Sequence, residues 1–259
     1  MSALGTHLQS AVRDGRKLLV PYLMAGIPDA VSFPAALAAV ARHADVVEVG
    51  LPYSDPLMDG PVIAAAGQRA IDAGVGPVRA LELAATETEG VPRVVMTYYN
   101  PVHRLGEEEF CRRAAGAGIA GLIVPDLPLE ESGPLRAAAA ESGLAWIPLV
   151  APTSSPERVE RIVATATGFV YAVSTLGVTG VRESLSERAA QVVEACRTAT
   201  DSPVLVGIGV SSPEQAVAAT ESADGVVIGS AVVRRVLEDG HEEAERFLGS
   251  VRAALDGSA

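Results

Sequence analysis

The chain repeats one pattern eight times: a short apolar run, a loop of turn-forming residues, and then a helix-forming segment. The apolar runs occupy 18–23, 46–50, 93–98, 121–124, 145–150, 168–173, 203–206 and 225–228. The helix-forming segments that follow them include 32–42, 61–73, 107–117, 130–141, 156–165, 186–198 and 213–220. Strands that alternate with helices form parallel sheets, so eight such units predict an α/β protein built as a (β/α)8 TIM barrel.

Further segments add helices to this pattern. The interval between the second and third runs is unusually long and predicts a second helix at 77–86. Residues 3–13 predict an extra N-terminal helix, and residues 238–255 predict an additional helix after the eighth strand. Because no break in composition divides the chain, we expect a single TIM-barrel domain over 1–259. A doubly wound open sheet shows the same alternation and remains the alternative.

Composition excludes several classes of protein. The 259 residues are 49% hydrophobic and carry a net charge of −12, without any Lys/Arg-rich run. Nucleic acid or an anionic membrane as the main partner is therefore disfavoured, because both require a basic surface. Residues 1–17 lack the apolar core of a secretory signal, and no apolar run is long enough to span a bilayer. The two cysteines, Cys111 and Cys196, and four scattered histidines predict a cytoplasmic protein without a disulfide framework or a metal site.

The second apolar run contains a carboxylate. With a strand period of two, Val46, Glu48 and Gly50 share one face, and Val47 and Val49 share the other. One face of a barrel strand points into the barrel, so Glu48 can project toward the barrel mouth. Desolvation there should raise its pKa, which suits a group that must both donate and accept a proton. A buried glutamate neutralised by a neighbouring hydrogen bond is the structural alternative.

Two aspartates lie on the loop that follows this strand. Asp55 precedes Pro56 and Asp59 precedes Gly60, so both aspartates can be explained as formers of Asx turns, with no catalytic role. Asp59 lies where a helix begins, and it can either cap that helix or face the pocket. For Asp55 the turn is the favoured interpretation from the residues alone.

Three later loops have the composition of ligand-binding loops. Residues 171–182 contain two glycines and small hydroxyl residues, which suit a lid over a substrate, and Tyr171 lies in the strand before them. Residues 207–213 and 229–231 carry glycines after the seventh and eighth strands, where barrels frequently bind phosphate. These loops predict a small phosphorylated substrate. No lysine follows Lys17 in the predicted strands, so Schiff-base chemistry is disfavoured and a carbon–carbon cleavage would need an electron sink in the substrate.

Several long strings resemble the tryptophan synthase α subunit family in content and order, over nearly the whole chain. They are Val20-Pro21-Tyr22 with Gly26, the string from Glu48 through Asp59-Gly60-Pro61, Met96 through Pro101, Gly121 through Pro128, Val150 through Thr153, Gly177 through Gly180, and Gly229-Ser230-Ala231. The resemblance implies retro-aldol cleavage of indole-3-glycerol phosphate to indole and glyceraldehyde 3-phosphate, a step of L-tryptophan biosynthesis.

The resemblance also implies roles for individual residues. Glu48 matches the acid/base that protonates indole C3, Asp59 matches the carboxylate that binds the indole N–H, and Tyr171 matches a tyrosine near the catalytic glutamate. Protonation at C3 supplies the electron sink. The positions that match substrate-pocket, lid and phosphate-binding residues are Tyr22, Tyr98, Thr179, Gly180, Gly209, Gly229 and Ser230.

By resemblance, the partner is a β subunit that holds pyridoxal phosphate (PLP) in an α2β2 assembly, and this chain itself needs no cofactor. The implied interface residues are Pro52, Tyr53, Asp55, Asn100 and Pro101. The resemblance thereby implies a second role for Asp55 besides forming a turn, namely an ion pair with a cation on the partner.

The chain departs from the family pattern at Met24, Ile27, Ala64, Ala120 and Thr175. These departures affect the expected polarity of the pocket and control of the lid, but not the reaction class. Three other hypotheses remain: a stand-alone lyase that releases free indole, a non-catalytic barrel that activates its partner, and a barrel enzyme for another phosphorylated metabolite.

Overall fold

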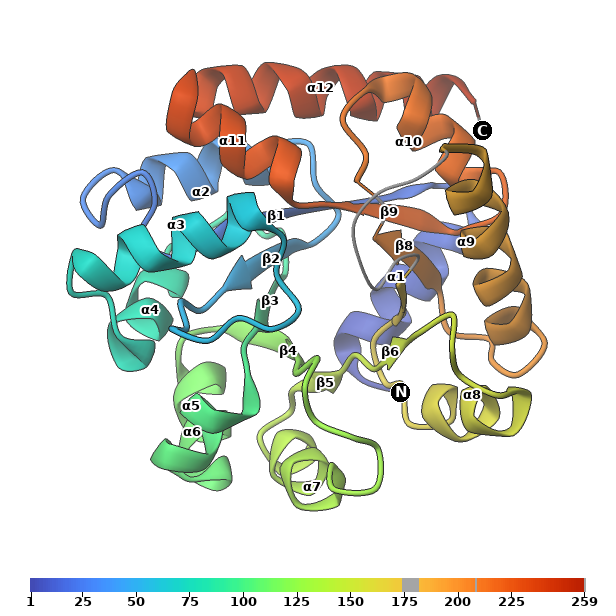
Figure 1. Cartoon of the computed structure of the whole chain (residues 1–259), viewed down its shortest axis with the longest axis horizontal. Helices are drawn as coiled ribbons and strands as arrows, with labels where there is room; N and C mark the ends of the chain where they lie inside the picture. The colour runs from blue at the N-terminus through green and yellow to red at the C-terminus, as the bar shows by residue number, and fades with distance from the viewer. Residues whose placement is uncertain (174–181, 208, 259) are drawn as a thin grey trace.

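The computed structural model describes residues 1–173, 182–207 and 209–258, which form a ring of parallel strands surrounded by helices (Figure 1). The strands are β1 (Leu18–Met24), β2 (Val47–Gly50), β3 (Arg93–Met96), β4 (Ile119–Ile123), β5 (Ala145–Trp146), β6 (Leu149–Val150), β7 (Val170–Val173), β8 (Val204–Gly207) and β9 (Gly225–Ile228). The helices are α1 (Ala3–Arg13), α2 (Phe33–Ala41), α3 (Pro61–Asp72), α4 (Pro77–Ala84), α5 (Tyr99–Leu105), α6 (Glu107–Gly116), α7 (Gly133–Glu141), α8 (Pro156–Val163), α9 (Arg182–Arg197), α10 (Pro213–Thr220), α11 (Ser230–Glu238) and α12 (His241–Gly257).

The sheet closes into a barrel. Its strand order is β5-β4-β3-β2-β1-β9-β8-β7-β6, and β5 and β6 are consecutive pieces of one segment, 145–150. β5 pairs with β4, whereas β6 pairs with β7, so this segment joins the two ends of the order. The TIM barrel is therefore confirmed, and the open doubly wound sheet is excluded.

Hydrophobic side chains fill both sides of the strand ring. The interior cluster contains Val20 of β1, Val94 of β3 and Leu205 of β8, together with Val46 directly before β2. Side chains of alternate register pack outward against the helices, as Val47 and Val49 of β2 do. This division follows from the period of two in a strand, and it confirms the face predicted for Val46 and Glu48.

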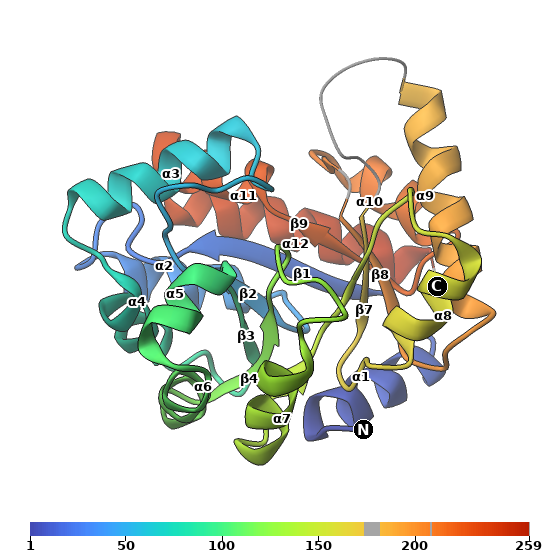
Figure 2. The same cartoon turned by 60° about the horizontal axis from the view of Figure 1, so that its bottom comes forward.

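The predicted extra N-terminal helix closes the bottom of the barrel. Leu4 and Leu8 of α1 belong to the interior cluster, and α1 lies at the opposite end of the strands from the loop that follows β2 (Figure 2). The first-turn donors of α1 are partly satisfied by Ser2, whose Oγ accepts a hydrogen bond from the Gly5 N–H. The mouth at the other end is therefore the open face of the barrel.

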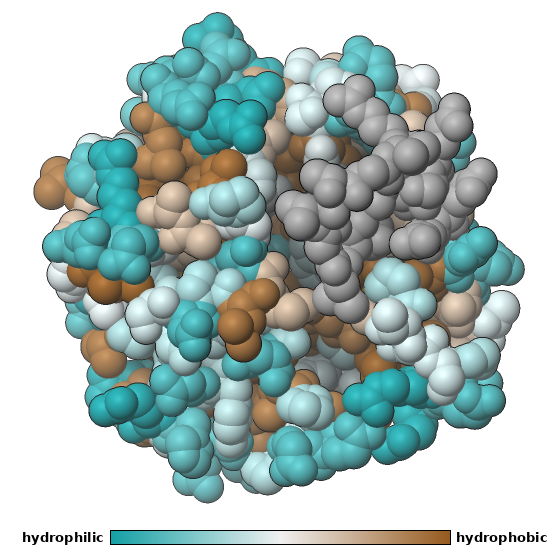
Figure 3. Space-filling model, in the orientation of Figure 1, coloured by the Kyte–Doolittle hydropathy of each residue, from teal (hydrophilic) through white to brown (hydrophobic). Residues whose placement is uncertain are grey.

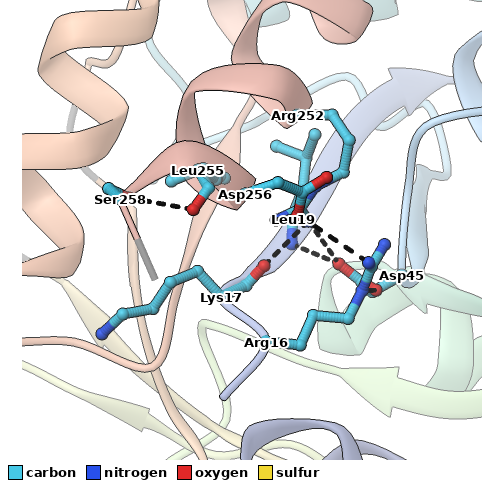
Figure 4. A network of polar contacts seen from close by, with 8 residues as sticks. All are labelled: Arg16, Lys17, Leu19, Asp45, Arg252, Leu255, Asp256 and Ser258. Atoms are coloured by element: carbon cyan, nitrogen blue, oxygen red, sulfur yellow. Dashed lines mark hydrogen bonds and ion pairs between the residues drawn. The ribbon is translucent and has the colours of Figure 1, made fainter. Parts of the chain in front are cut away.

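A polar network ties the last helix to the base of the barrel (Figure 4). Arg252 of α12 donates to the Lys17 carbonyl oxygen at 2.8 Å and to Asp45 at 3.2 Å. Asp45 also accepts from the Leu19 N–H at 2.8 Å and pairs with Arg16. The network thus connects the beginnings of β1 and β2 with α12.

Several elements differ from the sequence-based prediction, among them the following. The predicted strand at 145–150 is interrupted between Trp146 and Leu149. Helix α5 was not predicted, because Asn100-Pro101 resembles a loop, although proline is compatible with a first helical turn. The C-terminal helix predicted at 238–255 is wrong in its start: α11 ends at Glu238, and α12 begins after Gly240, whose φ is 93°. None of the helices in the described ranges could cross a membrane, since none is both long and apolar enough.

Candidate active site

Glu48 lies inside the barrel with almost no access to solvent. It is 1% exposed, and β2 holds it level with Tyr22 of β1 and Val94 of β3. Its Oε2 atom is buried and has no hydrogen-bond partner among the described residues. Burial, reinforced by the nearby negative charge of Asp59, raises the pKa of Glu48 to about 8. Its carboxyl is therefore mostly protonated at neutral pH, and the alternative of a glutamate neutralised by a neighbouring hydrogen bond has no support at Oε2.

Asp59 approaches Glu48 from the loop between β2 and α3. Burial raises the pKa of Asp59 to about 6, while a hydrogen bond from the Tyr98 side chain opposes that rise. The Tyr98 hydroxyl also accepts a hydrogen bond from the Met58 N–H at 3.0 Å. Gly60, not Asp59, is the N-cap of α3. The structure therefore favours the pocket-facing hypothesis for Asp59 over the helix-capping one.

Two tyrosines, the buried Tyr22 and the half-buried Tyr171, complete the group around the carboxylates. The pKa values of Tyr22 and Tyr171 are raised far above the usual value, first by burial and then by the charges of Asp59 and Glu48. Glycines make room for both rings. A methyl group on Gly50 would meet the Tyr22 hydroxyl at 1.9 Å, and one on Gly207 would meet the Tyr171 ring at 2.5 Å. Side chains from β1, β2 and β7 and from the β2–α3 loop thus converge at one point.

The start of α11 lies beside this group. Gly229 is the N-cap of α11 and Ser230 is its first residue. An added Cβ on Gly229 would lie 3.8 Å from the Tyr22 Cβ, which places this helix terminus next to the tyrosine. First-turn N–H groups lack acceptors within a helix and attract anions. Gly209 is exposed, and the space above its Cα is open. Thr179 and Gly180, which were predicted for the lid and the phosphate, lie outside the described residues, as does Thr175.

Two hollows flank the site on the mouth side, where hydrophobic and hydrophilic residues are interspersed (Figure 3). A cavity of about 260 Å³ lies at the ends of β4 to β7, and its lining includes Met58, Val124, Trp146 and Leu149. A groove of about 560 Å³ lies farther out and is lined in part by Pro52, Tyr53, Asn100 and Pro101. The groove therefore gathers four of the five predicted interface residues, and the fifth, Asp55, is exposed on the same loop.

Sequence reasoning missed the contacts of the methionines in this region. Met24 stands where many family members carry a small hydroxyl residue, and its sulfur accepts a hydrogen bond from the Tyr22 hydroxyl at 3.7 Å. Ile27, the neighbouring departure, is fully buried in the core around the helices. The Met58 backbone N–H holds Tyr98, and no sequence signal identifies such a backbone donor. In the described ranges, no group of three or more His, Cys, Asp or Glu residues is placed to hold a metal ion.

A closed parallel barrel whose strand ends bring together a protonated glutamate, an aspartate and a helix N-terminus defines an enzyme of the acid/base class that acts at the barrel mouth. Comparison with known proteins identifies the particular kind. Residues 8–255 match the protein family described as "Tryptophan synthase alpha chain". The chain belongs to this family, and it is therefore a lyase of tryptophan biosynthesis.

Individual relatives agree along almost their full length. The alpha chain of Carboxydothermus hydrogenoformans is 47% identical over 236 residues, which cover 90% of this chain and 88% of the relative. The alpha chain of Synechococcus elongatus is 44% identical over 260 residues, with 99% and 98% covered. A structure of Mycobacterium tuberculosis tryptophan synthase superposes with a TM-score of 0.91 at 42% identity, covering 98% of both chains. The alpha subunit from Legionella pneumophila gives a TM-score of 0.89 at 30% identity, covering 99% of each.

Proposed function

We propose that this chain cleaves indole-3-glycerol phosphate to indole and glyceraldehyde 3-phosphate, with Glu48 as the acid/base and Asp59 as the carboxylate that stabilises positive charge. The observation that carries the proposal is the pairing of a buried Glu48 oxygen, which has no hydrogen-bond partner among the described residues, with an adjacent Asp59 whose pKa is lower. Two carboxyl groups with separated pKa values can hold different protonation states at one pH, which allows different roles.

The first step is a proton transfer from Glu48 to C3 of the indole ring. Burial keeps the Glu48 carboxyl protonated up to a pH of about 8, so the acid form is present at neutral pH. Protonation converts the ring to an indolenine-like cation. Asp59, ionised above a pH of about 6, accepts a hydrogen bond from the ring N–H and stabilises this charge.

The second step returns the proton. The Glu48 carboxylate removes the proton from the glycerol hydroxyl next to the bond that breaks. The carbon–carbon bond then cleaves, its electron pair restores the aromatic indole, and the hydroxyl oxygen becomes the aldehyde oxygen of glyceraldehyde 3-phosphate. Glu48 ends protonated, as it began, so the cycle needs no external acid or base.

The substrate phosphate is proposed to bind at the N-terminus of α11, with Gly229 and Ser230, and at Gly209 after β8. Support comes from the start of α11, where the N-cap Gly229 has no side chain to accept the first-turn N–H groups, and from the open approach to Gly209. By family resemblance, Thr179 and Gly180 contribute to the lid and to the phosphate site, and Tyr22, Tyr98 and Tyr171 line the pocket.

A β subunit is the proposed partner, in an α2β2 assembly that passes indole from this chain to a PLP-dependent reaction. The groove lined by Pro52, Tyr53, Asn100 and Pro101, with exposed Asp55 beside it, is the proposed docking face. PLP belongs to the β subunit in this proposal, and the described part of this chain offers no lysine in the barrel after Lys17 to hold it. The proposed location is the cytoplasm.

Indole release from indole-3-glycerol phosphate, measured with and without a β subunit, tests the proposal. Glu48→Gln should lower the rate about 1000-fold, because the amide cannot transfer the proton. Asp59→Asn should lower it about 100-fold, because the amide carries no charge to offset the cation. Glu108→Gln, at an exposed position of α6, is the matched control and should retain the parent rate.

The outcome distinguishes this proposal from its alternatives. Slow release that rises strongly when the β subunit is added supports the synthase assignment. Rapid release by the chain alone would instead indicate a stand-alone lyase. If the folded parent chain releases no indole in either condition, the catalytic proposal is wrong and a non-catalytic activating subunit takes its place.

A further inference from the structure

We infer that Tyr98 is a positioning residue for Asp59, and that its stack with Tyr53 is the physical link by which occupation of the outer groove reaches the active site. This inference rests on the proposed function and extends it to regulation. It assigns no new chemistry to either tyrosine. It states instead that the carboxylate needed for the reaction is held in place by residues that also form the docking face.

The inner half of the link consists of hydrogen bonds. Tyr98 is 3% exposed and lies between the end of β3 and the start of α5. Its hydroxyl accepts a hydrogen bond from the Met58 N–H at 3.0 Å, and its interaction with the neighbouring Asp59 carboxylate lowers the pKa of Asp59. The hydroxyl therefore fixes the backbone of the β2–α3 loop at Met58, the residue directly before Asp59.

The outer half of the link is a ring contact. The Tyr53 and Tyr98 rings are stacked, with centroids 5.1 Å apart and an angle of 29° between their planes. The Tyr53 hydroxyl accepts a hydrogen bond from the Asn100 side-chain amide at 3.3 Å. Tyr53 and Asn100 both line the groove of about 560 Å³. The distance from the groove to the Asp59 carboxylate is therefore spanned by two aromatic side chains.

The charge of Asp59 depends on this arrangement. In the described part of the chain, the ionisable groups whose pKa is raised by the Asp59 charge are Tyr98, Glu48 of β2, Tyr22 of β1 and Tyr171 of β7. All are acidic or neutral, and only the hydrogen bond from Tyr98 lowers the pKa of Asp59. A protein seated in the groove would restrain Tyr53 and, through the stack, keep the Tyr98 hydroxyl on Asp59. Loss of that interaction would raise the pKa of Asp59.

Tyr98→Phe tests the inner half. We expect the acidic limb of the kcat/KM profile to move upward by about one pH unit, because one hydrogen bond to a charged group is lost. Carbon-13 NMR titration of the Asp59 carboxyl in the chain alone should show the same shift. Tyr99→Phe is the matched control, because it removes a hydroxyl that donates to Glu107 at 2.9 Å. This variant should leave both the acidic limb of the kcat/KM profile and the Asp59 titration unchanged. An unmoved Asp59 titration in Tyr98→Phe overturns the inference.

Tyr53→Ala tests the outer half of the link. Indole release is measured at a saturating concentration of β subunit, so that weaker binding of the β subunit does not affect the result. We expect the stimulation by the partner to fall at least fivefold and the acidic limb to move as in Tyr98→Phe. Tyr53→Phe, which keeps the ring, should restore both. Full stimulation of Tyr53→Ala with an unmoved limb would show that the partner acts by another route. If the parent chain itself releases no indole with the partner present, the proposed function fails, whereas the NMR titration still reports on the link.

Discussion

At the residue scale, the site depends on two carboxyl groups in different surroundings. Glu48 is enclosed by the barrel interior and has an oxygen without a hydrogen-bond partner in the described part of the chain, whereas Asp59 lies on a loop where Tyr98 lowers its pKa. The same burial that raises both pKa values is opposed by a donor only at Asp59. We therefore expect the reaction to have a pH window between about 6 and about 8, in which Glu48 is an acid and Asp59 is an anion.

The raised pKa of Glu48 also affects folding. The native state keeps the Glu48 proton up to a pH of about 8, whereas the unfolded chain releases it near the ordinary value of 4.5. Between these values the native state binds more protons, so the contribution of Glu48 to stability falls as the pH rises. Glu48→Gln should therefore raise the free energy of unfolding at pH 9 by an amount on the order of a few kcal/mol, and much less at pH 5. Urea denaturation at both pH values measures the difference; an equal effect at the two would contradict it.

Some of this chemistry could be predicted from residue types and some could not. The position of Glu48 inside a β-branched strand predicts its inward face and its raised pKa, because strand period and desolvation are local consequences of the sequence. The hydrogen bonds of Tyr98 to Asp59 and Met58 could not be predicted, since they depend on where a loop lies relative to another strand. The contact between Tyr22 and Met24 could have been suspected, because residues two apart in a strand share a face.

At the element scale, most strands and helices occur near their predicted positions, and the exceptions have local causes. Segment 145–150 carries a continuous apolar pattern, but its two halves pair with different neighbours and Pro148 cannot donate a ladder hydrogen bond. The break between α11 and α12 follows Gly240, and a glycine after a helical segment is a stop signal that could have been used. Pairing partners, by contrast, are not encoded in a single strand.

The seam between β1 and β9 gives a prediction for a single element. Gly225 lies opposite Leu18, and an added Cβ would meet the Leu18 carbonyl oxygen at 2.4 Å, which is backbone and cannot move aside. Gly225→Ala should lower the free energy of unfolding by about 2 kcal/mol, as overpacking in a core does. Gly116→Ala, at the end of α6 with open space around it, is the control and should be neutral or slightly stabilising. Thermal denaturation followed by circular dichroism compares the two, and equal melting temperatures would refute the steric argument.

At the scale of the whole molecule, the two ends of the barrel have different tasks. The mouth carries the buried carboxylates, the helix N-terminus and the outer groove. The base carries α1 and the network in which Arg252 joins the Lys17 carbonyl oxygen and Asp45 (Figure 4). Changes at the base are therefore expected to alter stability without altering the reaction.

Arg252→Leu should lower the free energy of unfolding by about 2 kcal/mol, because it leaves the Lys17 carbonyl oxygen without this donor and Asp45 with Arg16 as its remaining cation. Arg246→Leu, which removes an exposed ion pair with Glu243, should change the free energy of unfolding by less than about 0.5 kcal/mol.

We also expect one cooperative unfolding transition, as for a single domain over 1–259. Fluorescence of Trp146, the one tryptophan in the sequence, and far-ultraviolet circular dichroism should then give coincident curves. Separate midpoints would contradict that expectation.

The change of pairing partner within residues 145–150 has a practical consequence. Ile147 donates its ladder hydrogen bond to Leu122 of β4, whereas the Pro148 carbonyl oxygen accepts from Tyr171 of β7. The peptide bond between these residues is thus the boundary between two sets of strands, and cutting it would remove none of these hydrogen bonds. Residues 1–147 and 148–259, produced as separate polypeptides, would each keep their own strand pairs and meet again at this bond and along β1 and β9. The bond is a natural place to divide the gene for reassembly of the enzyme from two fragments.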